Sequence, residues 1–226
     1  RDADGRAGKV RHVTAAGTAA AGDIFTAEDF RVRALTRSWH PEADEFGDYH
    51  LNPDVTEDLR AMTLHDAAVL VPVIDRPGQP SVLLTQRTMK LRTHSGQVAF
   101  PGGRIDPEDG TAEIAAIREC GEETGIGPEH IEIVGRLPDY IAGSGFRISP
   151  VLSVVKPDFE IRPNPAEVDA VFEVPLSFLM DEANHGRGSR VVSGHVRNYF
   201  EMPYGDWYIW GVTAGIIRLM YERLYS

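Results

Sequence analysis

The chain has 226 residues, of which 42% are hydrophobic and 25% charged, a composition typical of a globular protein that can bury a core. Its formal net charge of -11 argues against general binding to nucleic acid or to anionic membranes, because both carry negative charge. The single cysteine, Cys120, leaves no partner for an internal disulfide and favours a reducing compartment, so we expect a cytoplasmic protein. The longest strongly apolar run, residues 67–74, is too short to cross a membrane.

The first part of the chain predicts a tail and an extension ahead of a domain. Residues 1–22 are rich in Ala, Gly and Arg without periodicity, which is typical of a flexible tail, and they lack the apolar stretch of a signal peptide. A helix is expected near 27–37, followed by a long polar loop and a short helix that ends at Met62. We therefore expect a partly flexible extension over 1–60 and one domain over 61–226.

The domain begins with two strands and continues with a mixture of strands and helices. The segments "AAVLVPVID" and "SVLLTQR" read as strands, and the turn "RPGQP" between them predicts a hairpin. Strands are also expected at 97–100, 131–137, 148–155 and 168–174, a hairpin with a long turn at 189–209, and helices at 111–124, 175–183 and 210–225. This mixture argues for an α/β (α+β) fold with a mixed β-sheet rather than a doubly wound parallel one.

The helix expected at 111–124 carries three glutamates near its C-terminal end. At about 100° per residue, Glu122 and Glu123 fall about 60° and about 40° to either side of Glu119, so the three carboxylates share one face. Acids in this place are disfavoured by the helix dipole, by roughly 0.3–1 kcal/mol each, and they repel one another. A bound divalent cation would remove both costs, and carboxylate oxygens suit Mg²⁺ or Mn²⁺. A solvated acidic face without a metal is the alternative.

The opposite face of this helix carries Ile114, Ile117 and Thr124, and we expect that face to meet the core. The acidic face also carries alanines, whose small side chains leave room for a ligand. Upstream, the Gly102-Gly103 turn allows bare backbone to approach this helix, and we expect a backbone carbonyl at Gly102 to be a further metal ligand.

Residues 118–126, "RECGEETGI", resemble the signature of the Nudix hydrolases, which reads arginine-glutamate-apolar-x-glutamate-glutamate-x-glycine-apolar. One part departs from the family pattern, because Asp109 stands where a glutamate is usual and the segment after it is one residue longer. The resemblance implies a Nudix-like α/β/α sandwich and a metal-dependent pyrophosphohydrolase. The residues that it makes catalytic are Arg118, Glu119, Glu122 and Glu123, of which the three glutamates also hold the metal.

Residues 83–103, "LLTQRTMKLRTHSGQVAFPGG", look like the pattern that marks coenzyme A pyrophosphatases within the Nudix group. The positions that match are Leu83, Leu84, Thr85, Arg87, Arg92, Gly96, Phe100, Pro101, Gly102 and Gly103. Thr88 departs, where serine or alanine is usual. The resemblance implies hydrolysis of coenzyme A or a derivative to 3',5'-ADP and 4'-phosphopantetheine or its acylated form, with Mg²⁺ or Mn²⁺ as cofactor.

Several other residues are candidates for contact with the substrate. Arg87 and Arg92 are expected to clamp phosphates, because guanidinium groups pair bidentately with phosphate oxygens; two solvated arginines are the alternative. His94 and Gln97 are expected to contact the substrate or to hold the loop, and Gly103 lets the substrate come close. In the wider family an acid such as Glu167, from a loop before a strand, assists as base or metal ligand, whereas an exposed loop glutamate is the alternative.

Alternative functions remain open from the sequence. A Nudix enzyme for ADP-ribose or a nucleoside triphosphate is one, a nucleotide-binding Nudix module without activity is another, and a plain domain with an acidic face is a third. The expected partner is a small-molecule nucleotide, with no nucleic acid and no membrane, and a homodimer is the oligomer that we consider. The aromatic residues Trp207, Tyr208 and Trp210 either stack on adenine or belong to the core.

Overall fold

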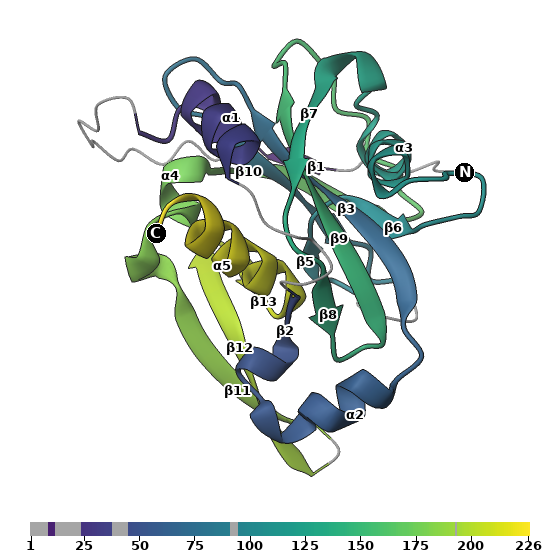
Figure 1. Ribbon diagram of the computed structural model, residues 1–226. Helices are drawn as coiled ribbons and strands as arrows, with labels where there is room; N and C mark the ends of the chain where they lie inside the picture. The colour runs from purple at the N-terminus through teal and green to yellow at the C-terminus, as the bar shows by residue number, and fades with distance from the viewer. Residues whose placement is uncertain (1–8, 12–23, 38–44, 91–94, 193) are drawn as a thin grey trace, which may run out of the picture.

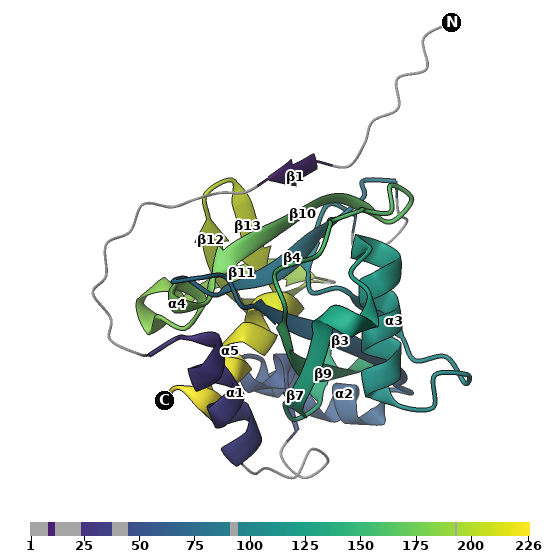
Figure 2. The same cartoon turned by 90° about the horizontal axis from the view of Figure 1, so that it is seen from above.

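The computed structural model describes residues 9–11, 24–37, 45–90, 95–192 and 194–226. These residues form a ten-stranded mixed sheet and a separate three-stranded antiparallel sheet (Figure 1). Helices lie on both faces of the large sheet, as the view from above shows (Figure 2). The expected α/β class with a mixed sheet is confirmed. In the described part of the chain no helix is long and apolar enough to cross a membrane.

The strands follow one another in short runs that helices separate. The large sheet is made of β1 (Lys9–Arg11), β2 (Phe46–Gly47), β3 (His65–Ile74), β4 (Ser81–Arg87), β5 (Val98–Ala99), β6 (Gly102–Arg104), β7 (Ile131–Arg136), β8 (Tyr140–Ala142), β9 (Phe146–Val155) and β10 (Val168–Pro175). The small sheet is made of β11 (Gly186–Val192), β12 (His195–Tyr204) and β13 (Trp207–Trp210). The α-helices are α1 (Ala27–Thr36), α2 (Thr56–Ala61), α3 (Ala112–Thr124), α4 (Leu176–Leu179) and α5 (Val212–Leu224). Short 3₁₀ helices are η1 (Asp48–His50), η2 (Pro53–Val55), η3 (Pro128–His130) and η4 (Glu182–Asn184).

Strand β3 lies at the centre of the large sheet, whose order is β1-β10-β4-β3-β9-β8-β2. It runs parallel to β9 in one register from His65 to Ile74, and it pairs with β4 only through Val73 and Ile74. The expected β3–β4 hairpin is therefore confirmed but short. Beyond it the two strands separate, so that β4 takes β5 as a partner and β3 takes β6. The glycine turn that joins β5 to β6 is thereby placed between the two central strands.

The central strands bury side chains on both faces, because successive residues of a strand point to opposite sides. On one face Ala68 and Leu70 pack with Ala115 of α3. On the other face Val71 and Val73 pack in a larger core that includes α1 and α5. Figure 1 shows α3 on one side of β3 and β9, with α1 and α5 on the other. The layers therefore form the α/β/α sandwich.

Helix α3 meets the sheet mainly with its alanine face, and of the expected face Thr124 is buried but Ile114 is not. Ala115, Ala116 and Cys120 are fully buried, whereas Ile114 is 54% exposed. The helix packs against β3 through its alanine face, since small side chains let a helix come close to a strand. The acids on that face are carried toward the sheet, and the isoleucine remains at the surface. The expectation that Ile114 faces the core is wrong.

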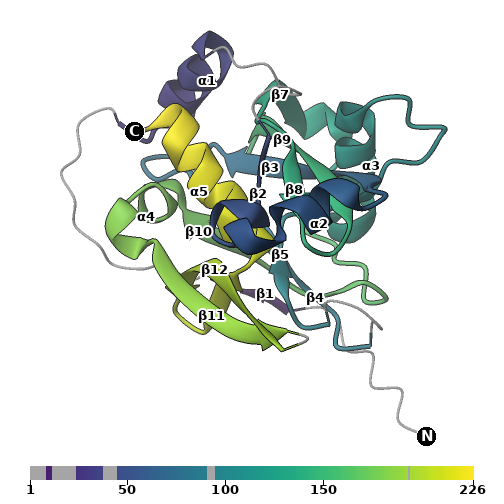
Figure 3. The same cartoon turned by 60° about the horizontal axis from the view of Figure 1, so that its bottom comes forward.

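The C-terminal part contains one more strand than expected. The segment at 189–209 is not a hairpin with a long turn, because β12 pairs with β11 on one side and with β13 on the other. Helix α5 lies between this small sheet and the large one (Figure 3). Trp207 belongs to the core and stacks on Phe172 of β10 with ring centroids 3.9 Å apart, while Tyr208 is 44% exposed.

Part of the expected extension is built into the same fold. Helix α1 buries Phe30 completely in the core that it shares with α5, and β2 pairs with β8. Asp48, which follows β2, accepts hydrogen bonds from the Tyr140 hydroxyl at 2.7 Å and from the Gly143 amide at 2.8 Å. The boundary at residue 60 stays a prediction, but α1 covers the face of the sheet opposite α3 (Figure 1), and β2 is the last strand of the sheet, next to β8.

We expect Phe30→Ala to destabilise the protein by about 3–5 kcal/mol, because it removes a fully buried aromatic ring and leaves a cavity. Leu35→Ala, on the exposed side of the same helix, is the matched control and should change the free energy of unfolding little, since Leu35 is 64% exposed. Urea unfolding of both variants gives the two values. If Phe30→Ala changed the free energy of unfolding as little as Leu35→Ala does, α1 would not unfold together with the sheet.

Candidate active site

Helix α3 is defined by capping at both ends. The Thr111 hydroxyl accepts a hydrogen bond from the Ile114 amide at 3.3 Å, and Gly125 ends the helix in the left-handed region with φ +80°. Both ends agree with the sequence prediction. The helix thus places its acidic turns beside the glycine turn at a fixed position along β3.

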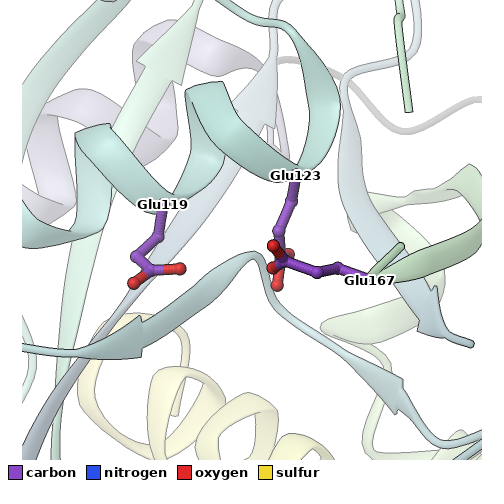
Figure 4. Close-up of side chains that lie close together, drawn as sticks. All are labelled: Glu119, Glu123 and Glu167. Carbon is purple, nitrogen blue, oxygen red and sulfur yellow. The ribbon is translucent and has the colours of Figure 1, made fainter. Parts of the chain in front are cut away.

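Three carboxylates come together under this helix. Ligand atoms of Glu119, Glu123 and Glu167 all lie within 4.8 Å of one another. Figure 4 shows the first two side chains leaving α3 toward the loop beneath it, while Glu167 reaches them from the start of β10. An all-oxygen set of three carboxylates suits a hard divalent cation such as Mg²⁺ or Mn²⁺.

Glu123 is the most enclosed member of this cluster. Its side chain is 2% exposed, and its Oε2 atom is buried without a hydrogen-bond partner among the described residues. Burial raises the pKa of Glu123 to about 8, and the opposing effect of the Arg87 guanidinium, 3.8 Å from the carboxylate, is smaller. An orphaned buried carboxylate oxygen beside two further acids is the arrangement that a bound cation would satisfy.

Glu119 occupies the space that the glycine turn leaves free. A Cβ at Gly103 would overlap the Glu119 carboxylate, and burial raises the pKa of Glu119 above its usual value. At Gly102, a Cβ would instead overlap the backbone of β3 at Ala68 and lie 2.7 Å from the Cα of Val69. The missing side chain at Gly102 therefore lets the turn lie against the sheet, and the missing side chain at Gly103 leaves room for the Glu119 carboxylate. Metal ligation by the Gly102 carbonyl stays a prediction.

Arg118 holds the acidic residues around it. Its guanidinium donates two hydrogen bonds of 2.8 Å to the carboxylate of Asp109 and one of 2.9 Å to Glu119. These bonds hold the pKa of Asp109 down at about 2, so this buried acid is charged at neutral pH. The aspartate that departs from the family pattern is therefore the main anchor of Arg118. In this structure Arg118 holds carboxylates, and a catalytic role for it stays a prediction.

Glu122 lies outside the three-carboxylate cluster. Its side chain is 53% exposed, and its carboxylate is 3.2 Å from the Arg118 guanidinium. Although Glu122 and Glu123 both lie within a quarter turn of Glu119, they lie on opposite sides of it, and only the Glu123 side faces the sheet. The structure thus brings Glu167, and not Glu122, next to Glu119 and Glu123. Metal ligation by Glu122 stays a prediction.

The structure describes some of the residues that are candidates for contact with the substrate, but not all of them. Arg87 stands at the end of β4 beside Glu123, and its Nε is buried without a hydrogen-bond partner among the described residues. Its amide donates to the Gln97 carbonyl at 2.9 Å, which ties the end of β4 to the segment before β5. Arg92 and His94 lie outside the described residues. Contact of these residues with substrate stays a prediction.

Sequence reasoning missed Asn164, which connects two members of the cluster. Its backbone amide donates to the Glu123 carbonyl at 3.0 Å, and its side-chain amide donates to the Glu167 carboxylate at 3.2 Å. The Asn-Pro pair at 164–165 is a turn signal, so the sequence alone points to a loop here but not to its partner.

Known proteins match the chain over most of its length. The family model described as NUDIX domain matches residues 63–192. The chain belongs to the Nudix hydrolase family. A Klebsiella pneumoniae protein is 42% identical over 158 residues, covering 70% of this chain and 82% of its own, and an Escherichia coli K12 protein is 39% identical over 168 residues, covering 74% and 86%. Both are described as uncharacterized Nudix hydrolases and named NudL.

A solved structure with a similar fold is the NUDIX domain of Shewanella oneidensis NrtR complexed with ADP ribose. It is 19% identical with a TM-score of 0.47, covering 76% of this chain and 98% of that domain. Nudix hydrolases generally use divalent metal ions, which agrees with the chemistry of the three-carboxylate cluster.

Substitution of the two glycines should separate the fold from the site. In Gly102→Ala the new Cβ would overlap the backbone of β3, which cannot move freely. We therefore expect a loss of about 1–3 kcal/mol in the free energy of unfolding. Gly103→Ala displaces only the end of the flexible Glu119 side chain, so we expect a smaller loss of stability together with weaker Mn²⁺ binding. Thermal unfolding and Mn²⁺ titration of both variants test this, and the reverse pattern would contradict it.

Metal-free protein should lose stability as the pH rises through the range between the two pKa values of Glu123. A glutamate in the unfolded chain titrates near about 4.3, whereas folding raises the pKa of Glu123 to about 8, so between these values the folded state holds a proton that the unfolded state has released. The contribution is on the order of 1 kcal/mol per pH unit. Urea unfolding in the presence of chelator measures the free energy of unfolding at each pH in this range. For Glu123→Gln this free energy should depend less steeply on pH than it does for the wild type.

Glu122→Gln is the control for this measurement, because it removes a carboxylate that is already 53% exposed. Its dependence on pH should follow that of the wild type. A Glu123→Gln curve that is as steep as the wild-type curve would show that burial of this carboxyl is not what makes stability depend on pH.

Proposed function

We propose that this protein hydrolyses the pyrophosphate bond of coenzyme A or one of its derivatives in a metal-dependent reaction. The products are 3',5'-ADP and 4'-phosphopantetheine or its acylated form. The observation that carries the proposal is the cluster of three carboxylates beneath a glycine turn, with an arginine at its edge. The substrate rests on the resemblance of residues 83–103 to the pattern of coenzyme A pyrophosphatases.

Glu119, Glu123 and Glu167 are the residues that we assign to Mg²⁺ or Mn²⁺. When bound, the cation neutralises diphosphate charge and lowers the pKa of a coordinated water. One of the same carboxylates takes the proton of the attacking water, because no other acid lies in the described cluster. Glu122 is assigned to Arg118 rather than to direct contact with the metal, since its carboxylate lies outside the cluster.

Two arginines have separate tasks in this proposal. Arg118 is occupied by Asp109 and Glu119, so it positions an acid and does not meet the substrate. Arg87 has a guanidinium that is only 3.8 Å from Glu123 and is 28% exposed, so it can turn toward a phosphate at the metal. Arg92, outside the described residues, is proposed as its partner in the phosphate clamp, with His94 and Gln97 beside it.

Two other functions compete with this one. A Nudix hydrolase for ADP-ribose or a nucleoside triphosphate uses the same cluster and differs only in how the rest of the substrate is held. A nucleotide-binding module without activity has no need to gather three carboxylates around one that is buried, since that arrangement costs free energy without a cation. We therefore favour an enzyme.

The proposal is tested by incubating the protein with Mg²⁺ or Mn²⁺ and each candidate substrate in turn, and by separating the products. The candidates are coenzyme A, dephospho-coenzyme A, ADP-ribose and nucleoside triphosphates. We expect coenzyme A to be cleaved fastest and excess chelator to abolish turnover. If Arg87 meets the 3'-phosphate, Arg87→Ala should lower kcat/KM for coenzyme A by about 10–100-fold and affect dephospho-coenzyme A far less. Equal losses would assign Arg87 to the shared pyrophosphate.

Arg190→Ala is a suitable control for the loss of one positive charge, because Arg190 lies on the exposed strand β11 and stacks over Trp210 at 4.7 Å. It should leave kcat/KM unchanged. Much faster cleavage of ADP-ribose than of coenzyme A would overturn the substrate while leaving the reaction class intact. Full turnover in excess chelator would overturn the role of the carboxylate cluster.

A further inference from the structure

The loop before β10 is fastened to the end of the helix that carries the acids. A helix leaves the carbonyl groups of its last turn without partners within the helix. In α3 two of these carbonyls are met by the loop: Arg162 donates its backbone amide to Thr124 at 2.8 Å, and Asn164 donates its own to Glu123 at 3.0 Å. The loop therefore caps the helix that precedes it by about forty residues, and it starts from a fixed place relative to Glu123.

Gly125 makes this close contact possible. Its positive φ of +80° ends α3, and a Cβ there would lie 2.9 Å from the Cβ of Arg162 and 3.2 Å from the Arg162 amide nitrogen. A side chain at Gly125 would therefore push away the loop that carries Glu167. The residue that terminates the helix also provides the surface on which this loop rests.

Asn164 then connects the loop to the third carboxylate. Its side-chain amide donates to Glu167 Oε1 at 3.2 Å, and its side-chain oxygen accepts from the Ala166 amide at 3.1 Å. Its carbonyl accepts from the amides of Glu167 and Val168 at 3.0 and 2.9 Å. One residue thus contacts the helix through its backbone and the Glu167 carboxylate through its side chain.

We propose that Asn164 is a positioning residue that holds the Glu167 carboxylate at the metal site, in register with Glu119 and Glu123. The inference rests on the proposed metal-dependent function. Three carboxylates within 4.8 Å repel one another, and Glu167 is attached through a loop rather than through α3, so it is the acid that can most easily turn away. A neutral amide donor restrains it without competing for the cation.

Asn164→Ser tests this with little other change. Serine keeps a side-chain oxygen for the Ala166 amide and keeps the backbone bond to Glu123, but it has no amide to offer Glu167. Mn²⁺ binding, followed by electron paramagnetic resonance of the free ion, needs no turnover. Because residues that orient metal ligands affect affinity by about 10–100-fold, we expect a loss of about tenfold or more.

A double-mutant cycle distinguishes positioning from a structural effect on the turn. Glu167→Gln should weaken Mn²⁺ binding by itself, and adding Asn164→Ser to it should cause no further loss, because the ligand that Asn164 orients is gone. Asn184→Ser, the same substitution in another turn where the side-chain amide meets the Phe178 carbonyl at 2.9 Å, is the control and should bind Mn²⁺ like the wild type. Losses that multiply in the double variant would overturn the proposal.

The outcomes separate this inference from the function on which it rests. If the wild type binds no Mn²⁺, the metal-dependent function fails and the inference fails with it. If the wild type binds Mn²⁺ and Asn164→Ser binds it equally well, the inference alone fails. Should Asn164→Ser not fold, Asn164→Asp carries the same test: it keeps the acceptor but sets a negative charge beside Glu167, and unchanged Mn²⁺ affinity would overturn the proposal.

Discussion

The close contact between α3 and β3 is the constraint on which the site depends. Ala115 and Ala116 are fully buried at this contact, and Gly102 has no space for a Cβ beside the backbone of β3. Larger side chains at these places would lift the helix and the turn away from the sheet. Only because both elements lie so close do Glu119 and Glu123 end in one enclosed space with Arg87 at its edge.

This contact has an electrostatic cost that the surrounding residues offset only in part. Arg118 compensates Glu119, and it is itself held by Asp109 through two hydrogen bonds. Glu123 has the more distant Arg87 and a backbone hydrogen bond from Gly102, and one of its oxygens has no partner in the described part of the chain. Burial raises the pKa of Glu123, and these partners lower it too little to restore the usual value. The Arg118 side of α3 is thus compensated by hydrogen bonds, whereas the buried carboxylate of Glu123 keeps an oxygen without a partner among the described residues.

Local signals were sufficient for the ends of α3 but not for its contacts. Thr111 and Gly125 mark the ends of α3, because capping depends on residues within a few positions. The helical period also gives the angles between side chains on α3. Which face of α3 meets the sheet, however, depends on the shape of a strand that is distant in the sequence. For that reason the alanine face, and not Ile114, was buried. The exposed position of Glu122, on the solvent side of Glu119, depends on the same contact.

Glu167 shows why a cluster of three carboxylates needs a residue from outside the helix that carries the other two. On a helix only residues about three or four positions apart can converge, and the sheet side of α3 has room for two acids among the alanines. A third must come from another element, and its position then depends on how that element is attached. Here the attachment uses the unpaired carbonyls at the end of the same helix, through Arg162 and Asn164. The helix that supplies two carboxylates therefore also sets the position of the third.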